Sequence, residues 1–214
     1  MRKRLPLLTA VAEGVTGGPQ IQNQGTIGGA ACAGKPASDI PGALLALEAL
    51  AVVQGPGGRR TVPATDLWLE PFRSALAADE LLIGFDVAVR GGGSRDGFAY
   101  RKLKFGTSSW PIVTVGAVAS LDEAGVLARL TVGIGAAAAV PFQVPAQDLV
   151  GSAPTNDLAE EIAVRAKDAL TDPWSDELAP AAYRTAVLPA VVRSVVAAAL
   201  TRAAGSQEAR SCPR

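Results

Sequence analysis

The order in which strand and helix signals follow one another limits the fold more than any single motif does. Three apolar or alternating runs are typical of β-strands: 98–104, 110–121 and 126–134. Turn residues at 122–125 join the last two runs as a hairpin. Only helical patterns come after them: 145–150, 156–170 and 178–203. Strands followed by helices predict an α+β domain, here with a three-stranded antiparallel sheet. Asn156 or Asp157 is expected to cap the middle helix, with Glu160 completing a capping box.

The first part of the chain mixes short elements. Helices are expected at 4–13 and at 39–50, where Asp39 is placed as the N-cap. The polar, glycine-dense stretch between them, 17–38, is expected to form a long loop, and long loops inside domains are usually functional. The remaining predictions are a hairpin, an irregular or partly helical segment and a strand: 51–53 with 59–62, 66–77, and 81–89.

A run of three glycines at 91–93 has the composition of a flexible joint. The pattern also changes there, from mixed elements to strands followed by helices. We therefore expect a first domain at 1–92, a second at 97–205, and a tail at 206–214.

Composition excludes several classes of function. Twenty basic and twenty acidic side chains give no net charge, which argues against nucleic-acid binding. The chain has no histidine, so a His-ligated metal site and a Ser-His-Asp triad are excluded. Two cysteines indicate neither a four-cysteine metal site nor a disulfide framework, which favours a cytoplasmic location. The most apolar stretch, 186–200, is interrupted by Arg193, so no membrane span is expected.

The glycine-dense stretch contains the residues most suited to binding a ligand. Gly28 and Gly29 allow the backbone to approach a ligand closely and to turn N–H groups toward phosphate or pyrophosphate oxygens. Thr26 adds a hydroxyl donor, and Asp39 is placed to accept from a ribityl hydroxyl or a ring N–H. A glycine pair is a weak signal by itself, and an ordinary surface turn before the helix at 39 explains it equally well.

This segment resembles the second flavin-contacting loop in the FAD-binding (medium) subunits of molybdenum hydroxylases, the family of carbon monoxide dehydrogenase and xanthine dehydrogenase. The family pattern Ile-Arg-Asn-x-Gly-Thr-[Ile/Val/Leu]-Gly-Gly-Asn stands at 21–30 as Ile-Gln-Asn-Gln-Gly-Thr-Ile-Gly-Gly-Ala. Further segments resemble the family in the same order: Lys-Pro-Ala-Ser-Asp-Ile-Pro at 35–41, Glu-Leu-Leu-Ile at 80–83, Tyr-Arg-Lys at 100–102 and Tyr-Arg at 183–184. The resemblance covers about residues 5–203.

The resemblance implies the second half of a PCMH-type FAD-binding domain, followed by a domain like the C-terminal domain of carbon monoxide dehydrogenase flavoproteins. It implies FAD as cofactor and assigns flavin contacts by position: Thr26, Ile27, Gly28, Gly29, Asp39, Leu82 and Lys102. The residues alone favour a solvated strand lysine for Lys102 and an ordinary core residue for Leu82. Three positions depart from the pattern, because Ala30 lacks the family's amide and Gln22 and Gln24 lack its arginine charge.

The function implied by the resemblance is electron transfer within an oxidoreductase complex. In related complexes a molybdopterin-binding large subunit oxidises the substrate, a small subunit with two [2Fe–2S] clusters relays the electrons, and the flavin subunit passes them to an acceptor. Flavin chemistry belongs to the cofactor, so we expect no catalytic side chain and no metal ligand in this chain. The alternative is a truncated, non-catalytic scaffold that keeps partner binding but not FAD.

Members of the family begin with a β/α subdomain whose own glycine-rich loop holds the other side of the FAD pyrophosphate. The first residue of this sequence falls after that subdomain. We therefore expect the chain by itself to bind FAD weakly or not at all, and to expose apolar surface at 4–13 and 39–50.

Overall fold

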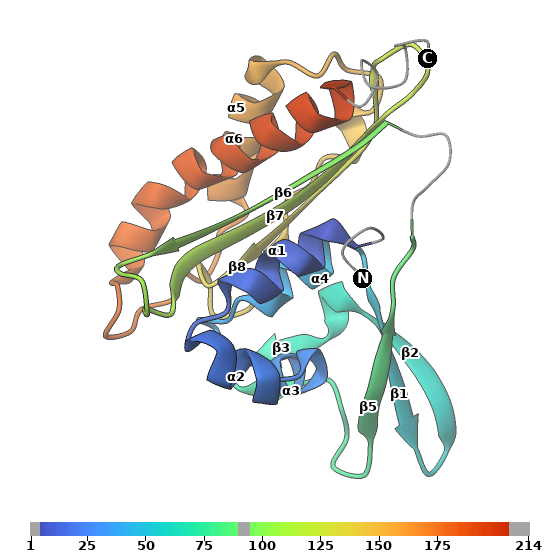
Figure 1. The fold of residues 1–214 in the computed structure, drawn as a ribbon, viewed down its shortest axis with the longest axis vertical. Helices are drawn as coiled ribbons and strands as arrows, with labels where there is room; N and C mark the ends of the chain where they lie inside the picture. Colours follow the sequence, from blue (N-terminus) through green and yellow to red (C-terminus); the bar gives the residue numbers. More distant parts are fainter. Residues whose placement is uncertain (1–4, 90–94, 206–214) are drawn as a thin grey trace.

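The computed structural model describes residues 5–89 and 95–205 (Figure 1). Its helices are α1 (Pro6–Gly14), α2 (Gly18–Gln24), α3 (Ile27–Cys32), α4 (Ile40–Ala46), α5 (Asn156–Asp168) and α6 (Ala181–Gly205). Its strands are β1 (Leu50–Gly55), β2 (Gly58–Pro63), β3 (Trp68–Glu70), β4 (Arg73–Ser74), β5 (Leu81–Asp86), β6 (Arg95–Lys104), β7 (Pro111–Leu121), β8 (Leu127–Gly135) and β9 (Phe142–Gln143). Antiparallel sheets with separate groups of helices confirm the α+β class.

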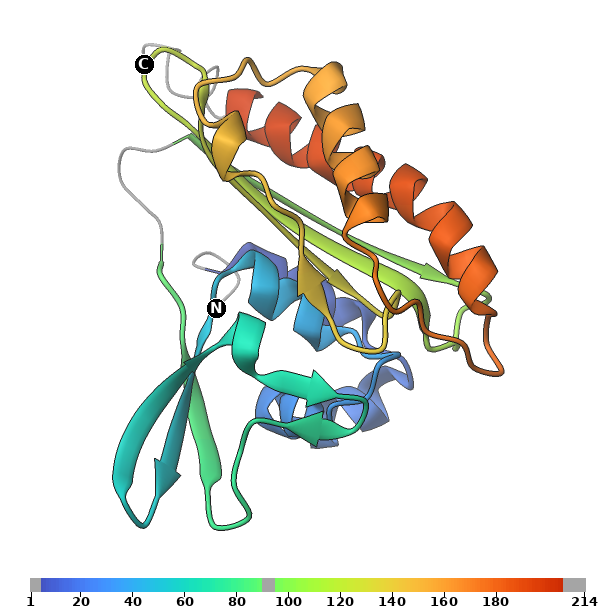
Figure 2. The ribbon, with the colours of Figure 1, turned by 180° about the vertical axis from the view of Figure 1, so that it is seen from behind.

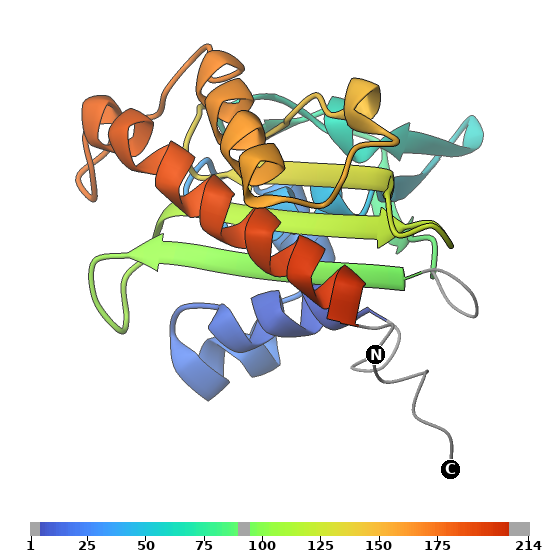
Figure 3. The ribbon, with the colours of Figure 1, turned by 90° about the horizontal axis from the view of Figure 1, so that it is seen from above.

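The larger sheet is antiparallel and has the strand order β6-β7-β8-β9. Helices α5 and α6 lie on one of its faces, and α1 and α4 lie on the other (Figures 1 and 3). Because both faces are covered, every residue of β7 is buried. This explains why β7 reads as a mainly apolar run, with Thr114 and Ser120 as its polar residues, rather than as an alternating one.

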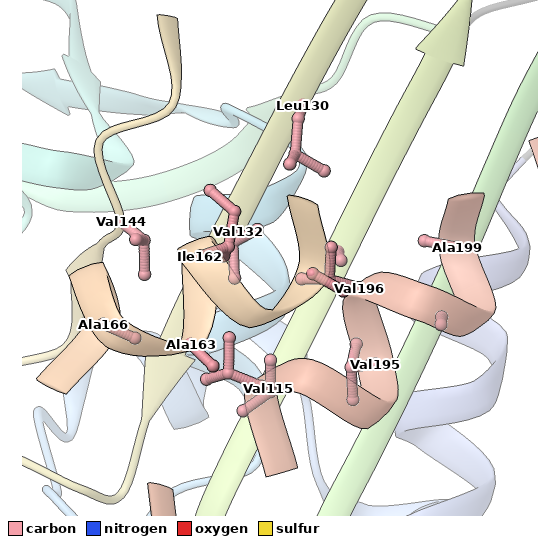
Figure 4. Close-up of a cluster of buried hydrophobic side chains, with 14 of the residues drawn as sticks. Val115, Leu130, Val132, Val144, Ile162, Ala163, Ala166, Val195, Val196 and Ala199 are labelled. Carbon is pink, nitrogen blue, oxygen red and sulfur yellow. The ribbon is translucent and has the colours of Figure 1, made fainter. Parts of the chain in front are cut away.

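Small side chains fill the layer between this sheet and α5 and α6. Figure 4 shows Val115 and Val132 from the sheet packed with Ile162 of α5 and Val196 of α6. At Gly97 the approach is closer still, since a Cβ placed there would lie 2.0 Å from the main-chain oxygen of Ala199. Helix α6 therefore packs directly on the backbone of β6.

Glycine also sets the distance between the sheet and α4. A Cβ on Gly133 of β8 would lie 2.1 Å from a main-chain oxygen of α4, so only glycine fits there. The helix is then fixed at its C-terminal end by two side chains of the sheet. Thr131 Oγ1 donates to a carbonyl of that end at 2.6 Å, and Gln143 Nε2 donates to another at 2.7 Å. The Thr131 bond satisfies the Ala46 carbonyl at the helix end, and the Gln143 bond adds a second donor to the Leu45 carbonyl, which also accepts from the Glu48 N–H.

A smaller sheet of order β2-β1-β5 projects away from the larger one, and the short β3–β4 ribbon lies beside it (Figures 1 and 2). Trp68 joins this region to α3, because its Nε1 donates to the Ala31 carbonyl at 2.9 Å. Arg60 of β2 donates to both carboxylate oxygens of Glu80 at 2.7 Å. The hydrogen bonds from Arg60 lower the pKa of Glu80 to about 2.

Helix α6 is long and apolar enough to meet the length and hydropathy criteria for a membrane span. Its position accounts for that composition, because it lies along β6 and β7 with nine of its residues buried. One of them is the fully buried Arg184 near its start. The Arg184 guanidinium donates to the carbonyls of Ile112 and Ala136 and to the carboxylate of Asp176, so this charge is paired and hydrogen-bonded inside the core.

The structure differs from the sequence-based expectation in several places. The segment 66–77, expected to be irregular or partly helical, contains the β3–β4 ribbon, and 145–150 forms only the short 3-10 helix Gln147–Leu149. The apolar surface expected to be exposed at 39–50 is buried from Pro41 to Ala46.

Three further differences concern single elements. The larger sheet has a fourth strand, β9, whose two residues are too few to produce a period-2 pattern. The stretch 17–38, expected to be a loop, contains α2 and α3. Proline in the first turn of α2 and Thr26 before α3 are compatible with helix starts, and neither helix is long enough to give a hydrophobic period.

The third difference is the cap of α5. Thr155, one residue earlier than expected, accepts from the Leu158 N–H at 3.3 Å, so Glu160 does not occupy the capping-box position. Both hairpins, 51–62 and 110–134, are confirmed. The expected glycine joint at 91–93 and the tail at 206–214 lie outside the described residues.

Candidate functional site

The Gly-Thr-Ile-Gly-Gly run at 25–29 forms the cap and start of α3 rather than an open loop. Thr26 is the N-cap, and its Oγ1 accepts from the Gly29 N–H at 2.9 Å. A Cβ on Gly29 would lie 3.0 Å from that oxygen, which explains the small residue there. Within the described residues the N–H groups of Ile27 and Gly28 have no protein acceptor. Of the two predicted glycine N–H donors, that of Gly29 is used by the Thr26 cap, and that of Gly28 is left together with the Ile27 N–H at a helix start rather than in a glycine nest.

Gly28 faces β5. A Cβ added to Gly28 would find Leu82 Cδ2 at 3.8 Å and no other atom within contact distance. Leu82 is half-buried against the core of the smaller sheet. The structure therefore brings two predicted contact positions, far apart in the sequence, to one surface.

Lys102 and Asp39 form a buried ion pair. The ammonium lies 2.9 Å from the Asp39 carboxylate, and the two side chains are only 6% and 7% exposed. The ammonium also donates to the Gly14 carbonyl at 3.1 Å and to Thr16 Oγ1 at 2.7 Å. Its three N–H donors thus have three acceptors. The alternative of a solvated strand lysine is wrong, because the Lys102 side chain is buried and bonds to Gly14, Thr16 and Asp39.

Asp39 precedes α4 as expected, but its side chain makes no capping bond within the described residues. It accepts instead from Lys102 and from the Tyr100 hydroxyl, which lies 3.3 Å from Oδ1. Burial raises the pKa of Tyr100 far above its ordinary value, and the Asp39 charge raises it further. Tyr100 therefore stays protonated and remains a donor to the carboxylate.

The predicted positions form two groups: Thr26 to Gly29 with Leu82, and Asp39 with Lys102. Helix α3 connects them, because it packs on both α4 and β5. Sequence reasoning missed Thr16 and Tyr100. Tyr100 could have been found, since it lies two residues from Lys102 on the same face of β6. Thr16 gave no signal, because its place beside Lys102 depends on how α1 packs.

Residues 1–87 match the FAD binding domain in molybdopterin dehydrogenase, and residues 98–199 match the CO dehydrogenase flavoprotein C-terminal domain. The chain is 33% identical to the carbon monoxide dehydrogenase medium chain of Hydrogenophaga pseudoflava, over 95% of this chain and 70% of that one. It is 30% identical to the nicotine 6-hydroxylase medium subunit of Paenarthrobacter nicotinovorans, over 94% and 69% of the two chains.

A solved structure of carbon monoxide dehydrogenase from Hydrogenophaga pseudoflava superposes with a TM-score of 0.86. The identity is 32%, and the match covers 94% of this chain and 69% of that one. Fold and sequence together define a flavoprotein class, in which FAD is the cofactor. The chain belongs to the family of FAD-binding medium subunits of molybdenum hydroxylases, and it is an oxidoreductase subunit.

The residues present fit FAD. The start of α3 offers two N–H donors without protein acceptors, which suit phosphate oxygens. Gly28 leaves room for close approach of a ligand, because only Leu82 lies near its missing side chain. The donors of Lys102 and Tyr100 are used within their own cluster with Asp39, so this cluster offers a fixed arrangement of charges rather than free donors.

Proposed function

We propose that the chain is the flavin-carrying subunit of a molybdenum-containing hydroxylase or dehydrogenase complex, and that it passes electrons from [2Fe–2S] clusters through FAD to an acceptor. The observation that carries the proposal is the similarity to medium subunits in sequence and fold over nearly the whole chain. It is supported by the ion pair between two of the predicted contact residues, Asp39 and Lys102. When bound, FAD supplies the electron-transfer chemistry. The protein binds and orients the cofactor.

The residues have separate tasks in this proposal. The Ile27 and Gly28 N–H groups and the Thr26 hydroxyl bind the phosphates. Leu82 packs against the cofactor next to Gly28. Asp39 and Lys102 place one negative and one positive group in fixed positions near the ring, and Tyr100 holds the carboxylate in place. Because the pair is almost fully buried, its field is weakly screened by solvent.

The partners proposed for this subunit are a molybdopterin-binding large subunit and a [2Fe–2S] small subunit. The relatives are described as medium chains or subunits, and such chains belong to multi-subunit complexes. We also propose a cytoplasmic location and a division into domains at 1–92 and 97–205.

Flavin titration of the purified chain tests the proposal. Protein is added to FAD while flavin fluorescence and visible absorbance are followed, so that weak binding is also measured. Asp39→Asn and Lys102→Met are expected to lower the affinity. Lys167→Met, a lysine substitution on the exposed face of α5, serves as the matched control and is expected to change nothing. Affinities equal in all four proteins would refute the assignment of Asp39 and Lys102. A wild-type chain that leaves the flavin fluorescence and absorbance unchanged would favour the scaffold alternative.

A further inference from the structure

Thr16 stands between the buried ion pair and the loop that joins β6 to β7. It lies in the short connection between α1 and α2. Its Oγ1 accepts from Lys102 Nζ at 2.7 Å and donates to the Ser109 carbonyl at 2.8 Å. A threonine hydroxyl has one hydrogen to donate, and that hydrogen goes to Ser109. The Thr16 hydroxyl therefore acts both as an acceptor and as a donor.

On the side of the ion pair, Thr16 supplies the shortest of the three bonds to the ammonium. The other two acceptors are the Gly14 carbonyl at 3.1 Å and Asp39 at 2.9 Å. With all three donors paired, the ammonium has one preferred orientation. Removal of the Thr16 oxygen would leave a donor of a buried cation without its acceptor, and that donor would turn toward another acceptor or toward water.

On the other side, the β6–β7 loop is closed mainly by its own contacts. The Gly106 N–H donates to Ser109 Oγ at 3.1 Å, and the Ser109 N–H donates to the Gly106 carbonyl at 3.2 Å. Lys104 Nζ donates to the Thr107 carbonyl at 2.7 Å. These bonds shape the loop but do not place it against the rest of the chain. The bond from Thr16 and the contact of Lys35 with the Trp110 ring, at 3.7 Å, do so.

We infer that Thr16 is a positioning residue of the flavin site, which holds the Lys102 ammonium and the β6–β7 loop in one fixed arrangement. This inference rests on the proposed function, since it assumes that Lys102 faces the cofactor. No positional signal in the sequence marks Thr16. Its role follows from the hydroxyl that joins a charged group of the site to the loop following the same strand.

The test compares Thr16→Val with Thr16→Ser in the full chain. Valine keeps the shape and loses the hydroxyl, whereas serine keeps the hydroxyl. Thr9→Val is the matched control, because the Thr9 hydroxyl donates only to the Leu5 carbonyl of its own helix turn. Amide hydrogen exchange of 103–110 reports on the loop without cofactor, and exchange in α5 and α6 reports on global stability. FAD titration, with Lys102→Met alongside, reports on the site.

We expect Thr16→Val to speed exchange in 103–110 without changing α5 and α6, and to weaken FAD binding about tenfold, as for one charge-assisted hydrogen bond. Thr16→Ser and Thr9→Val should behave as wild type in both measurements. Unchanged loop exchange in Thr16→Val overturns the inference. So does weaker FAD binding in Lys102→Met but not in Thr16→Val, and in that case the proposed site stands. If Lys102→Met binds FAD normally, the proposed site itself fails.

Discussion

The buried pair of Asp39 and Lys102 should behave as one energetic unit, and a double-mutant cycle measures this. Both side chains are less than a tenth exposed, so removal of one charge leaves the other uncompensated. Breaking a buried ion pair costs about 3–5 kcal/mol. We expect Asp39→Asn and Lys102→Met each to lower the free energy of unfolding by about 3 kcal/mol. Independent losses would then sum to about 6 kcal/mol.

The double variant is expected to lose only about 3–4 kcal/mol, because it leaves no unpaired charge. The coupling energy is then about 2–3 kcal/mol. Urea unfolding of the four proteins, followed by circular dichroism and extrapolated linearly to water, gives the free energies. Additivity within about 0.5 kcal/mol would refute the reasoning, since it would mean that the two groups do not depend on each other.

Three further predictions concern other contacts. Glu80→Gln should be less stable than wild type at neutral pH. Because the pKa of Glu80 is lowered from 4.5 to about 2, this difference in stability should shrink as the pH falls from 4.5 to about 2, and urea unfolding midpoints measured against pH test this. Gly133→Ala should destabilise the chain by about 3 kcal/mol or prevent folding, because its Cβ would meet the backbone of α4, whereas Gly84→Ala has open space and should be tolerated in the same unfolding assay. Gly28→Asp should keep the wild-type melting temperature within a few degrees but lose FAD binding, because its carboxylate would repel the phosphates. Gly28→Ala should fold equally well and bind FAD more tightly than Gly28→Asp.

The strands of the larger sheet could be predicted because their signals are strong and local. The residues of β7 are apolar apart from Thr114 and Ser120, and the turn at 122–125 fixes the pairing with β8. Strand β9 could not be predicted in the same way. Its place depends on Gln143, whose side chain reaches a carbonyl of α4 98 residues away in the sequence. Such a contact exists only after the helix has docked.

The site could be predicted only in part, and there is a physical reason why some of its features could be predicted and others could not. Backbone requirements leave a trace in the sequence, as Gly28, Gly29 and the capping Thr26 illustrate. Side-chain pairing across elements leaves none. Asp39 reads as a helix cap and Lys102 as a solvated strand residue, and only the packing of α4 on the sheet makes them one buried pair.

The Asp39–Lys102 pair also links the two regions of the chain that match different family domains. Asp39 belongs to the region that matches the FAD-binding domain, and Lys102 to the region that matches the flavoprotein C-terminal domain. Asp39 directly precedes α4, and α4 packs on the sheet at the close distance that Gly133 allows. A flavin bound at these residues would therefore experience a field that depends on both regions at once. Substitution at Gly133, which is not itself a proposed cofactor contact, should then weaken FAD binding together with stability, whereas substitution at Gly28 should separate the two.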